Sequence, residues 1–147
     1  MTVSAKMFGN AVLKAFNKEV DWDTDAIRVM LLTSAVAPDQ DTWIYKSHIV
    51  ANGGVEVVGT AYVARGALLG TKTIGYTADN VIKLSGAAVT WAVSTITARY
   101  AIIYDDTTVD ATSVLLGFVD FGADQVSSAG NFTITWNTDG IFTITAA

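Results

Sequence analysis

The share of β-branched residues constrains this chain more than any other feature of its sequence. Threonine, valine and isoleucine occur 19, 17 and 11 times, so 47 of the 147 residues are β-branched, against 8 leucines. Such side chains are stiff about χ1 and pack well on a pleated surface. We therefore expect the chain to fold mainly as β-sheet.

Length and composition narrow the fold class further. A chain of 147 residues with 51% hydrophobic residues has the size of one domain and can bury a core without disulfides. From Asn52 onward, turn-forming residues recur roughly every 8 to 12 residues, as in sandwiches and barrels. We predict a mainly β, antiparallel β-sandwich or jelly-roll-like single domain with one or two short helices near its N-terminus. Residues 1–19 are assigned to an N-terminal arm or helix and residues 20–147 to the sandwich.

Two segments are predicted to be helical. Residues 5–18 place Phe8, Val12 and Phe16 four residues apart, which is the spacing of one helix face. A second helical turn is expected after Pro38, because proline favours the first position of a helix.

The rest of the pattern predicts strands. The strongly apolar run of residues 26–33 is typical of a central strand. A turn at residues 137–140 should join the last two strands as a hairpin. The other strands are predicted at residues 55–58, 62–69, 71–76, 81–85, 88–91, 97–104, 114–121, 131–136 and 141–145.

The chain lacks the residues that several classes of function need. Without cysteine it has no thiol nucleophile and no thiolate zinc site, and a single histidine, His48, excludes a multi-histidine metal site. Ser47 is adjacent to His48, which is a poor geometry for a nucleophile and its base, and no G-x-S-x-G elbow or phosphate-binding glycine loop occurs. We expect a rim histidine, no catalytic residues and no cofactor.

Charge is distributed unevenly along the chain. The formal net charge is −5, and residues 1–83 hold eight cationic and eight acidic residues, so the whole excess belongs to residues 84–147. This distribution argues against a nucleic-acid partner, which needs clustered Lys and Arg. No run of about 18 apolar residues occurs, and polar residues interrupt the N-terminus where a signal peptide would be apolar. We expect a soluble, non-secreted product and no membrane partner.

A first acidic cluster precedes the predicted central strand. Asp21, Asp23 and Asp25 have the spacing that opens an EF-hand loop, but Ala26 and Leu32 stand where that loop needs glycine and glutamate. We interpret the cluster as a solvated turn, with a loose calcium site as the alternative.

A second acidic cluster, Asp105, Asp106 and Asp110, lies between two predicted strands. We interpret it as a polar hairpin loop whose Asp and Thr side chains bond to the backbone. A cation site, or a docking point for a basic neighbour, is the alternative.

The apolar excess of the chain indicates protein partners. Its mean hydropathy of +0.40 is high for a small soluble monomer, and large exposed apolar patches usually mark interfaces. Four tryptophans, Trp22, Trp43, Trp91 and Trp136, could line a sugar site, although anchoring of a core or an interface is their commoner role.

The most distinctive motifs lie in the C-terminal half. The sequence is STITARYAIIYDDT at residues 94–107, LLGFVDFGADQ at 115–125, SSAGNFTITW at 127–136 and GIFTI at 140–144. Together with DTDAIRVMLLT at residues 23–33, these motifs resemble a family of small tailed-bacteriophage virion proteins. The resemblance extends over about residues 20–145.

The resemblance implies a non-enzymatic structural protein of the virion. We expect a capsid decoration, or cement, protein that is made in the host cytoplasm and binds the outer surface of the head. Its expected partners are the major capsid protein and further copies of this chain, as a homo-oligomer and most simply a trimer. Because the N-terminal segment lies mostly outside the resemblance, we expect it to contact the capsid. The expected contact residues are Lys6, Met7, Phe8, Val12, Leu13, Phe16 and Trp43.

Two alternatives remain open from the sequence. The first is a tail-associated or head-fibre base protein, because proteins of the resembled family have several roles in the virion. The second is a carbohydrate-binding surface module that uses the tryptophans.

Overall fold

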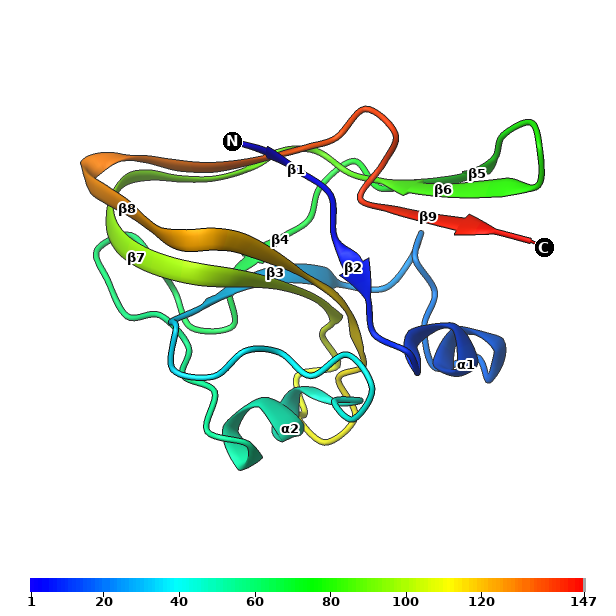
Figure 1. The fold of residues 1–147 in the computed structure, drawn as a ribbon, viewed down its shortest axis with the longest axis horizontal. Coiled ribbons are helices and arrows are strands. Elements are labelled where there is room, and N and C mark those ends of the chain that lie inside the picture. Colours follow the sequence, from blue (N-terminus) through cyan, green and yellow to red (C-terminus); the bar gives the residue numbers. More distant parts are fainter. Residues whose placement is uncertain (147) are drawn as a thin grey trace.

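Two β-sheets and two short helices make up residues 1–146, which the computed structural model describes (Figure 1). The strands are β1 (Thr2–Val3), β2 (Lys6–Met7), β3 (Ile27–Leu32), β4 (Ala67–Leu68), β5 (Thr73–Tyr76), β6 (Val81–Ser85), β7 (Val89–Asp105), β8 (Leu115–Trp136) and β9 (Phe142–Thr145), and the helices are α1 (Ala11–Phe16) and α2 (Lys46–Ala51). One sheet has the order β1-β8-β7-β3-β4 with β2 also paired to β8, and the other has the order β5-β6-β9. The predicted mainly β, sandwich-like fold with two short helices is confirmed.

The long hairpin of β7 and β8 organises the fold. The two strands are joined by residues 106–114 and pair antiparallel over nearly their whole length. Figure 1 shows that the hairpin curves back on itself, so that its two ends lie in different layers. Register shifts near Ser94 and Ala98 mark the curve, because β-bulges let a strand pair turn a corner. The sequence pattern predicts four separate strands here, since it treats the bulged positions as strand ends.

Two buried serines hold the curve of the hairpin. The Ser94 and Ser127 hydroxyls lie 2.7 Å apart, and Ser94 also donates to the Gly130 carbonyl at 3.1 Å. The Ile96 amide donates to the Ser127 oxygen at 3.2 Å. Together these bonds satisfy polar groups that the bulge would otherwise leave buried without partners.

Ser94→Ala is expected to lower the free energy of unfolding by roughly 1–2 kcal/mol, because it takes a partner from the buried Ser127 hydroxyl. Urea denaturation followed by tryptophan fluorescence measures the change. The matched control is Ser128→Ala, at the exposed position directly after Ser127. Equal stabilities for the two variants would contradict this role of Ser94.

Strand β3 lies between β7 and β4, as the predicted central strand should. Val29 and Leu31 point into a core cluster between the layers, while Met30 and Leu32 point into a second cluster on the opposite face. Successive side chains of a strand alternate between faces. Because both faces are covered, β3 is apolar at nearly every position.

Several predicted elements differ from the structure. The predicted helix over residues 5–18 is shorter, Ala11–Phe16, because Lys6 and Met7 pair with β8 as a strand. The second helix is not the turn after Pro38, where the Asp39 carboxylate accepts the backbone amides of Asp41 and Thr42. It forms instead as α2, eight residues later.

The predicted strands between α2 and β5 are mostly loop. Residues 55–58 contribute a single bridge, Leu32↔Glu56, and of residues 62–69 only β4 is a strand. The other predicted strands overlap observed ones, and residues 81–85 coincide with β6.

The predicted hairpin of the last two strands is wrong. The turn at residues 137–140 does form, but β9 then leaves β8 and pairs with β6. Ile141 and Phe142 are both buried, and the Ile141 amide donates to the Leu84 carbonyl at 2.8 Å. Burial of these two side chains between the sheets outweighs the local preference for a hairpin.

Candidate functional site

The N-terminal segment, the expected capsid contact, is an integral part of the fold. Strand β1 pairs in parallel with the end of β8, and β2 pairs antiparallel with the start of β8. The Ala5 amide donates to the Ile141 carbonyl at 3.0 Å. Backbone hydrogen bonds therefore join the segment that precedes α1 to β8 and to the residue before β9.

Helix α1 presents an apolar surface to solvent. Ala11 faces the core, whereas Leu13 is 53% and Phe16 83% exposed. Full burial of a phenylalanine side chain contributes about 1.5–3 kcal/mol, and this contribution is not realised within the chain. Exposed apolar side chains of this size are typical of surfaces that contact another protein.

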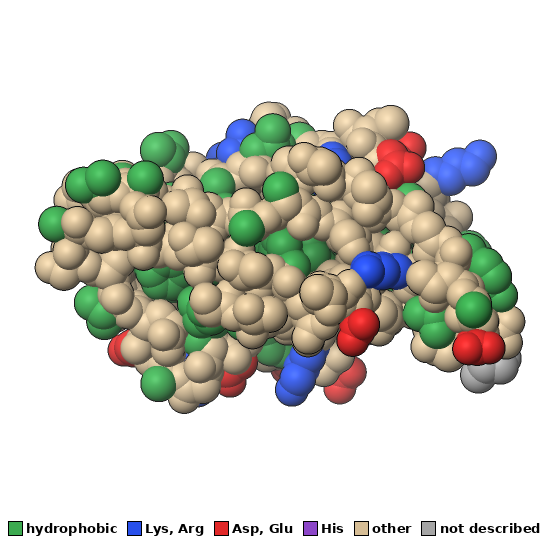
Figure 2. Space-filling model, turned by 90° about the horizontal axis from the view of Figure 1, so that it is seen from above, with side chains coloured by type: hydrophobic (Ala, Val, Ile, Leu, Met, Phe, Trp, Pro, Cys, Tyr) green, Lys and Arg blue, Asp and Glu red, His purple; other side chains and the backbone are tan. Residues whose placement is uncertain are grey.

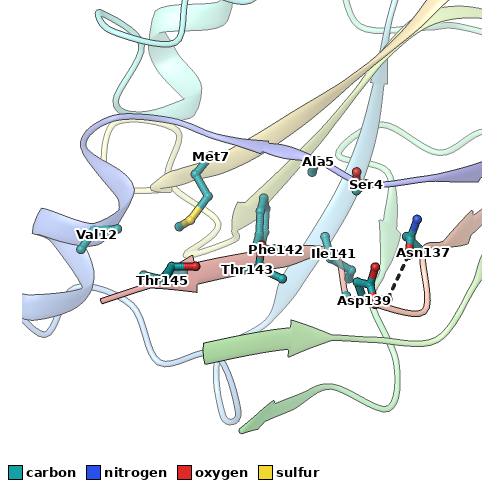
Figure 3. A pocket seen from close by; sticks show the side chains of 12 residues that line it. Ser4, Ala5, Met7, Val12, Asn137, Asp139, Ile141, Phe142, Thr143 and Thr145 are labelled. Atoms are coloured by element: carbon teal, nitrogen blue, oxygen red, sulfur yellow. Dashed lines mark hydrogen bonds between the residues drawn. The ribbon is translucent and has the colours of Figure 1, made fainter. Parts of the chain in front are cut away.

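A groove runs between α1 and the three-stranded sheet, next to Phe16. Its apolar part has a volume of about 160 Å³, and a wider, more polar part of about 550 Å³ continues along β9. Figure 3 shows Met7 and Phe142 between β2 and β9, with Val12 at the helix end. We call this feature the α1–β9 groove; it is lined by Met7, Val12, Phe16, Ile74, Phe142 and Ile144.

Two of the expected contact residues are core residues. Phe8 and Trp43 are each 1% exposed, and their rings stack with centroids 6.5 Å apart. Phe8 also packs against Phe118, with centroids 5.4 Å apart. The expectation that Phe8 and Trp43 contact a partner is therefore wrong for these two side chains, because the chain's own second core cluster buries them. Lys6, Leu13 and Phe16 are exposed, and Met7 and Val12 are half-buried.

The lysines of the N-terminal segment differ in their surroundings. Lys14 donates to the Tyr45 hydroxyl at 2.6 Å and to the Glu19 carboxylate at 3.0 Å. The bond to Tyr45 and then that to Glu19 raise the pKa of Lys14. Lys6 and Lys18 are exposed on either side of the helix. The segments that precede and follow α1 along the chain therefore each carry an exposed cation.

The first acidic cluster forms a capped turn. The Asp21 carboxylate accepts the amides of Asp23 and Thr24 at 3.1 and 3.2 Å, and Asp25 accepts the Asp21 amide at 2.6 Å. The bonds from Thr24 hold the pKa of Asp21 below its usual value. These carboxylates satisfy the backbone of the turn between α1 and β3, as the sequence interpretation proposes.

The second acidic cluster is paired with cations of the same chain. Asp106 contacts the Arg65 guanidinium, and its Oδ2 atom lies 2.8 Å from Arg28 Nε. Asp110 lies 2.6 Å from Arg65 Nη1 and 3.2 Å from Lys46 Nζ. Burial alone would raise the pKa values of Asp106 and Asp110, but Arg65 holds both below their usual range. A docking point for an external basic group is contradicted at these two residues, because internal cations occupy their carboxylates.

Asp105 is the exception within this cluster. Its side chain is buried, with 3% exposure, beside the carboxyl of Asp25. Burial first, and then the neighbouring Asp25, raise the pKa of Asp105 to about 7. Among the described residues, no group of three or more His, Asp or Glu side chains is arranged to hold a metal ion.

His48 acts as a helix cap. Its Nδ1 atom accepts the backbone amides of Ile44 and Tyr45 at 2.9 and 3.3 Å, which closes a capping box at the start of α2. Its position is half-buried. The expected rim histidine therefore has a structural role that the sequence pattern does not reveal.

All four tryptophans belong to the interior. Trp22, Trp43, Trp91 and Trp136 are between 1% and 8% exposed. The indole nitrogens of Trp22 and Trp136 donate to backbone carbonyls, each at 3.0 Å. A sugar ring stacks on an open aromatic face, and these faces are covered by the chain itself.

The sequence matches no protein-family model and no curated protein, and no solved structure matches the chain. None of the described helices is long and apolar enough to cross a membrane.

Proposed function

We propose that this protein is a non-enzymatic structural component of a tailed-bacteriophage virion, namely a capsid decoration protein that binds the outer surface of the head. The observation that carries the proposal is the exposed apolar surface of α1, with Phe16 83% exposed beside the α1–β9 groove. The motifs of residues 94–144 support the assignment to a virion. The major capsid protein is the proposed partner, with the decoration protein itself present as a homo-oligomer, most simply a trimer.

The mode of action follows from the placement of α1. The helix is short, but β1 and β2 anchor the chain before it to β8, so its exposed side chains are held by a rigid sheet. Leu13 and Phe16 would enter a pocket of the capsid protein, while Lys6 and Lys18 would face acidic groups at its rim. Many copies of a modest contact, repeated over a lattice, resist outward pressure on the shell through multivalency.

Deletion of the N-terminal segment is an unsuitable test, because it would remove β1, β2 and the buried Phe8 as well. Phe16→Ser is the sharper change. We expect it to leave the free energy of unfolding within about 0.5 kcal/mol of the wild-type value. Its affinity for empty capsids should fall by roughly tenfold or more, as for an aromatic hot spot. Co-sedimentation with empty capsids measures the affinity.

The control for this experiment is Val50→Ser on α2, where the side chain is 72% exposed. This variant should bind capsids as the wild type does. Undiminished binding of the Phe16→Ser variant would overturn α1 as the contact surface. Binding to tails but not to heads would favour the alternative of a tail-associated protein.

A further inference from the structure

The outward face of the β7–β8 hairpin, where it curves, carries no charge. Residues 86–98 and 125–138 contain no Lys, Arg, His, Asp or Glu. The adjoining loop of residues 57–64 contains none either. In Figure 2, the side chains at the upper left of the view are apolar or uncharged, and most of the charged ones lie elsewhere.

Strand pairing sets the composition of this face. Val89, Trp91, Ser94 and Ile96 of β7 are buried, whereas Thr90, Thr95 and Thr97 are exposed on the opposite, outward face. Pairs in register place their side chains on one face, as Thr97↔Val126 and Thr90↔Thr133 do. We call this surface the uncharged face; its members are Thr90, Thr95, Thr97, Val126, Ser128 and Thr133.

Exposed valines extend the uncharged face. Val126 is 68% exposed, and Val93 of the same hairpin is 66% exposed. The bridge Thr60↔Thr95 joins the 57–64 loop to β7, and Val58 in that loop is 97% exposed. The sheet surface of a monomer normally carries interspersed charges that keep it soluble and block pairing with other strands. The lack of charge here indicates that another protein covers this face.

At the curve of the hairpin, the backbone holds the exposed Val93 in an unusual conformation. Val93 has φ +49°, a left-handed conformation that is a genuine outlier for a β-branched residue. The Asn131 side chain accepts the Val93 amide at 3.2 Å and helps to hold it there. Strained backbone of this kind persists mainly where it serves a function, and here it keeps an apolar side chain on the surface.

We propose that the uncharged face packs against a second copy of this chain. Each hydroxyl both donates and accepts hydrogen bonds, so a face of hydroxyls and methyl groups is complementary to itself. The Thr90 and Thr133 hydroxyls already pair at 3.0 Å within one copy. The inference rests on the homo-oligomer of the proposed function and assigns its contact surface, but it does not depend on capsid binding by α1.

Charge favours a second copy as the occupant. Each chain carries −5, all of it from residues 84–147, so two copies repel one another over much of their surfaces. Contact through the uncharged face brings no like charges together and buries no unpaired ion. A strongly basic or acidic partner would find no complementary group there.

Analytical ultracentrifugation of the isolated protein tests the proposal. The wild type is expected to associate, and Val126→Glu should raise the dissociation constant by roughly tenfold or more, since it places two like charges in the contact. The control Val50→Glu changes an equally exposed valine on α2 and should associate as the wild type does. A wild type that is monomeric at millimolar concentration overturns the proposal, and so does an unchanged association of Val126→Glu.

A second measurement covers the case in which Val126→Glu does not fold. The chain has no cysteine, so Thr97→Cys carries a single nitroxide label within the uncharged face. We expect strong dipolar coupling between labels of associated copies, and much weaker coupling for labelled Val50→Cys. Equal coupling at both positions contradicts the proposal. Neither measurement contains capsids, so failure here is distinguishable from failure of the capsid assignment.

Discussion

Asp106→Ala is expected to lower the free energy of unfolding by about 3–5 kcal/mol, the usual cost of removing one partner from a buried ion pair. The Asp106 side chain is 4% exposed and contacts both Arg28 and Arg65. It also accepts the Thr108 amide at 2.9 Å, which shapes the loop between β7 and β8. Without the carboxylate, two guanidinium groups face each other with only Asp110 left to balance them. Chemical denaturation at neutral pH measures the loss.

The control for Asp106→Ala is Asp124→Ala, which removes an exposed carboxylate from β8. Its effect should stay within about 0.5 kcal/mol, as for most surface substitutions. If both variants lose the same small amount, the Asp106 network does not stabilise the fold.

Asp105→Asn is expected to stabilise the protein at pH 8 by on the order of 3 kcal/mol. In the folded chain the pKa of Asp105 is raised to about 7 by burial and by Asp25, whereas an unfolded aspartate titrates near 3.9. The folded state therefore binds the proton more tightly. The stability due to the protonated carboxyl is fully present below about pH 4 and is lost as pH rises through 7. Asparagine mimics the protonated form at every pH.

Thermal unfolding between pH 4 and pH 8 tests this prediction. The wild type should lose stability as the pH rises through 7, and the Asp105→Asn variant should lose much less. Asp23→Asn, in the exposed turn before β3, is the control and should keep the wild-type pH profile. Parallel profiles for the wild type and Asp105→Asn would show that Asp105 does not titrate in this range.

The sheet could be predicted where local pattern and burial agree. Strand β3 is apolar because both of its faces are covered, and β6 has turn residues at both ends, so each has clear limits in the sequence. The course of β9 could not be predicted, because the turn before it is compatible with a hairpin. Only the burial of Ile141 and Phe142 against the other sheet decides its partner.

In the candidate site, too, features set by local pattern could be predicted, and features set by the packing of distant segments could not. The sequence expects both Leu13 and Phe16 at a contact with the capsid, and both side chains are exposed; whether they contact a partner stays a prediction. Phe8 and Trp43 belong to the same apolar class, and only the packing of distant segments distinguishes them as core residues. The pairing of Asp106 with Arg28 and Arg65 likewise joins residues about 40 to 80 positions apart. His48 caps the start of α2 with its side chain, a role that the sequence pattern does not predict.

The location of the protein on the virion is the central claim, and electron cryomicroscopy of virions that carry this protein with a density label tests it most directly. The proposed function predicts label density that repeats over the outer surface of the head with the symmetry of the capsid lattice. Label density confined to the tail, or its absence from the particle, would contradict the proposal.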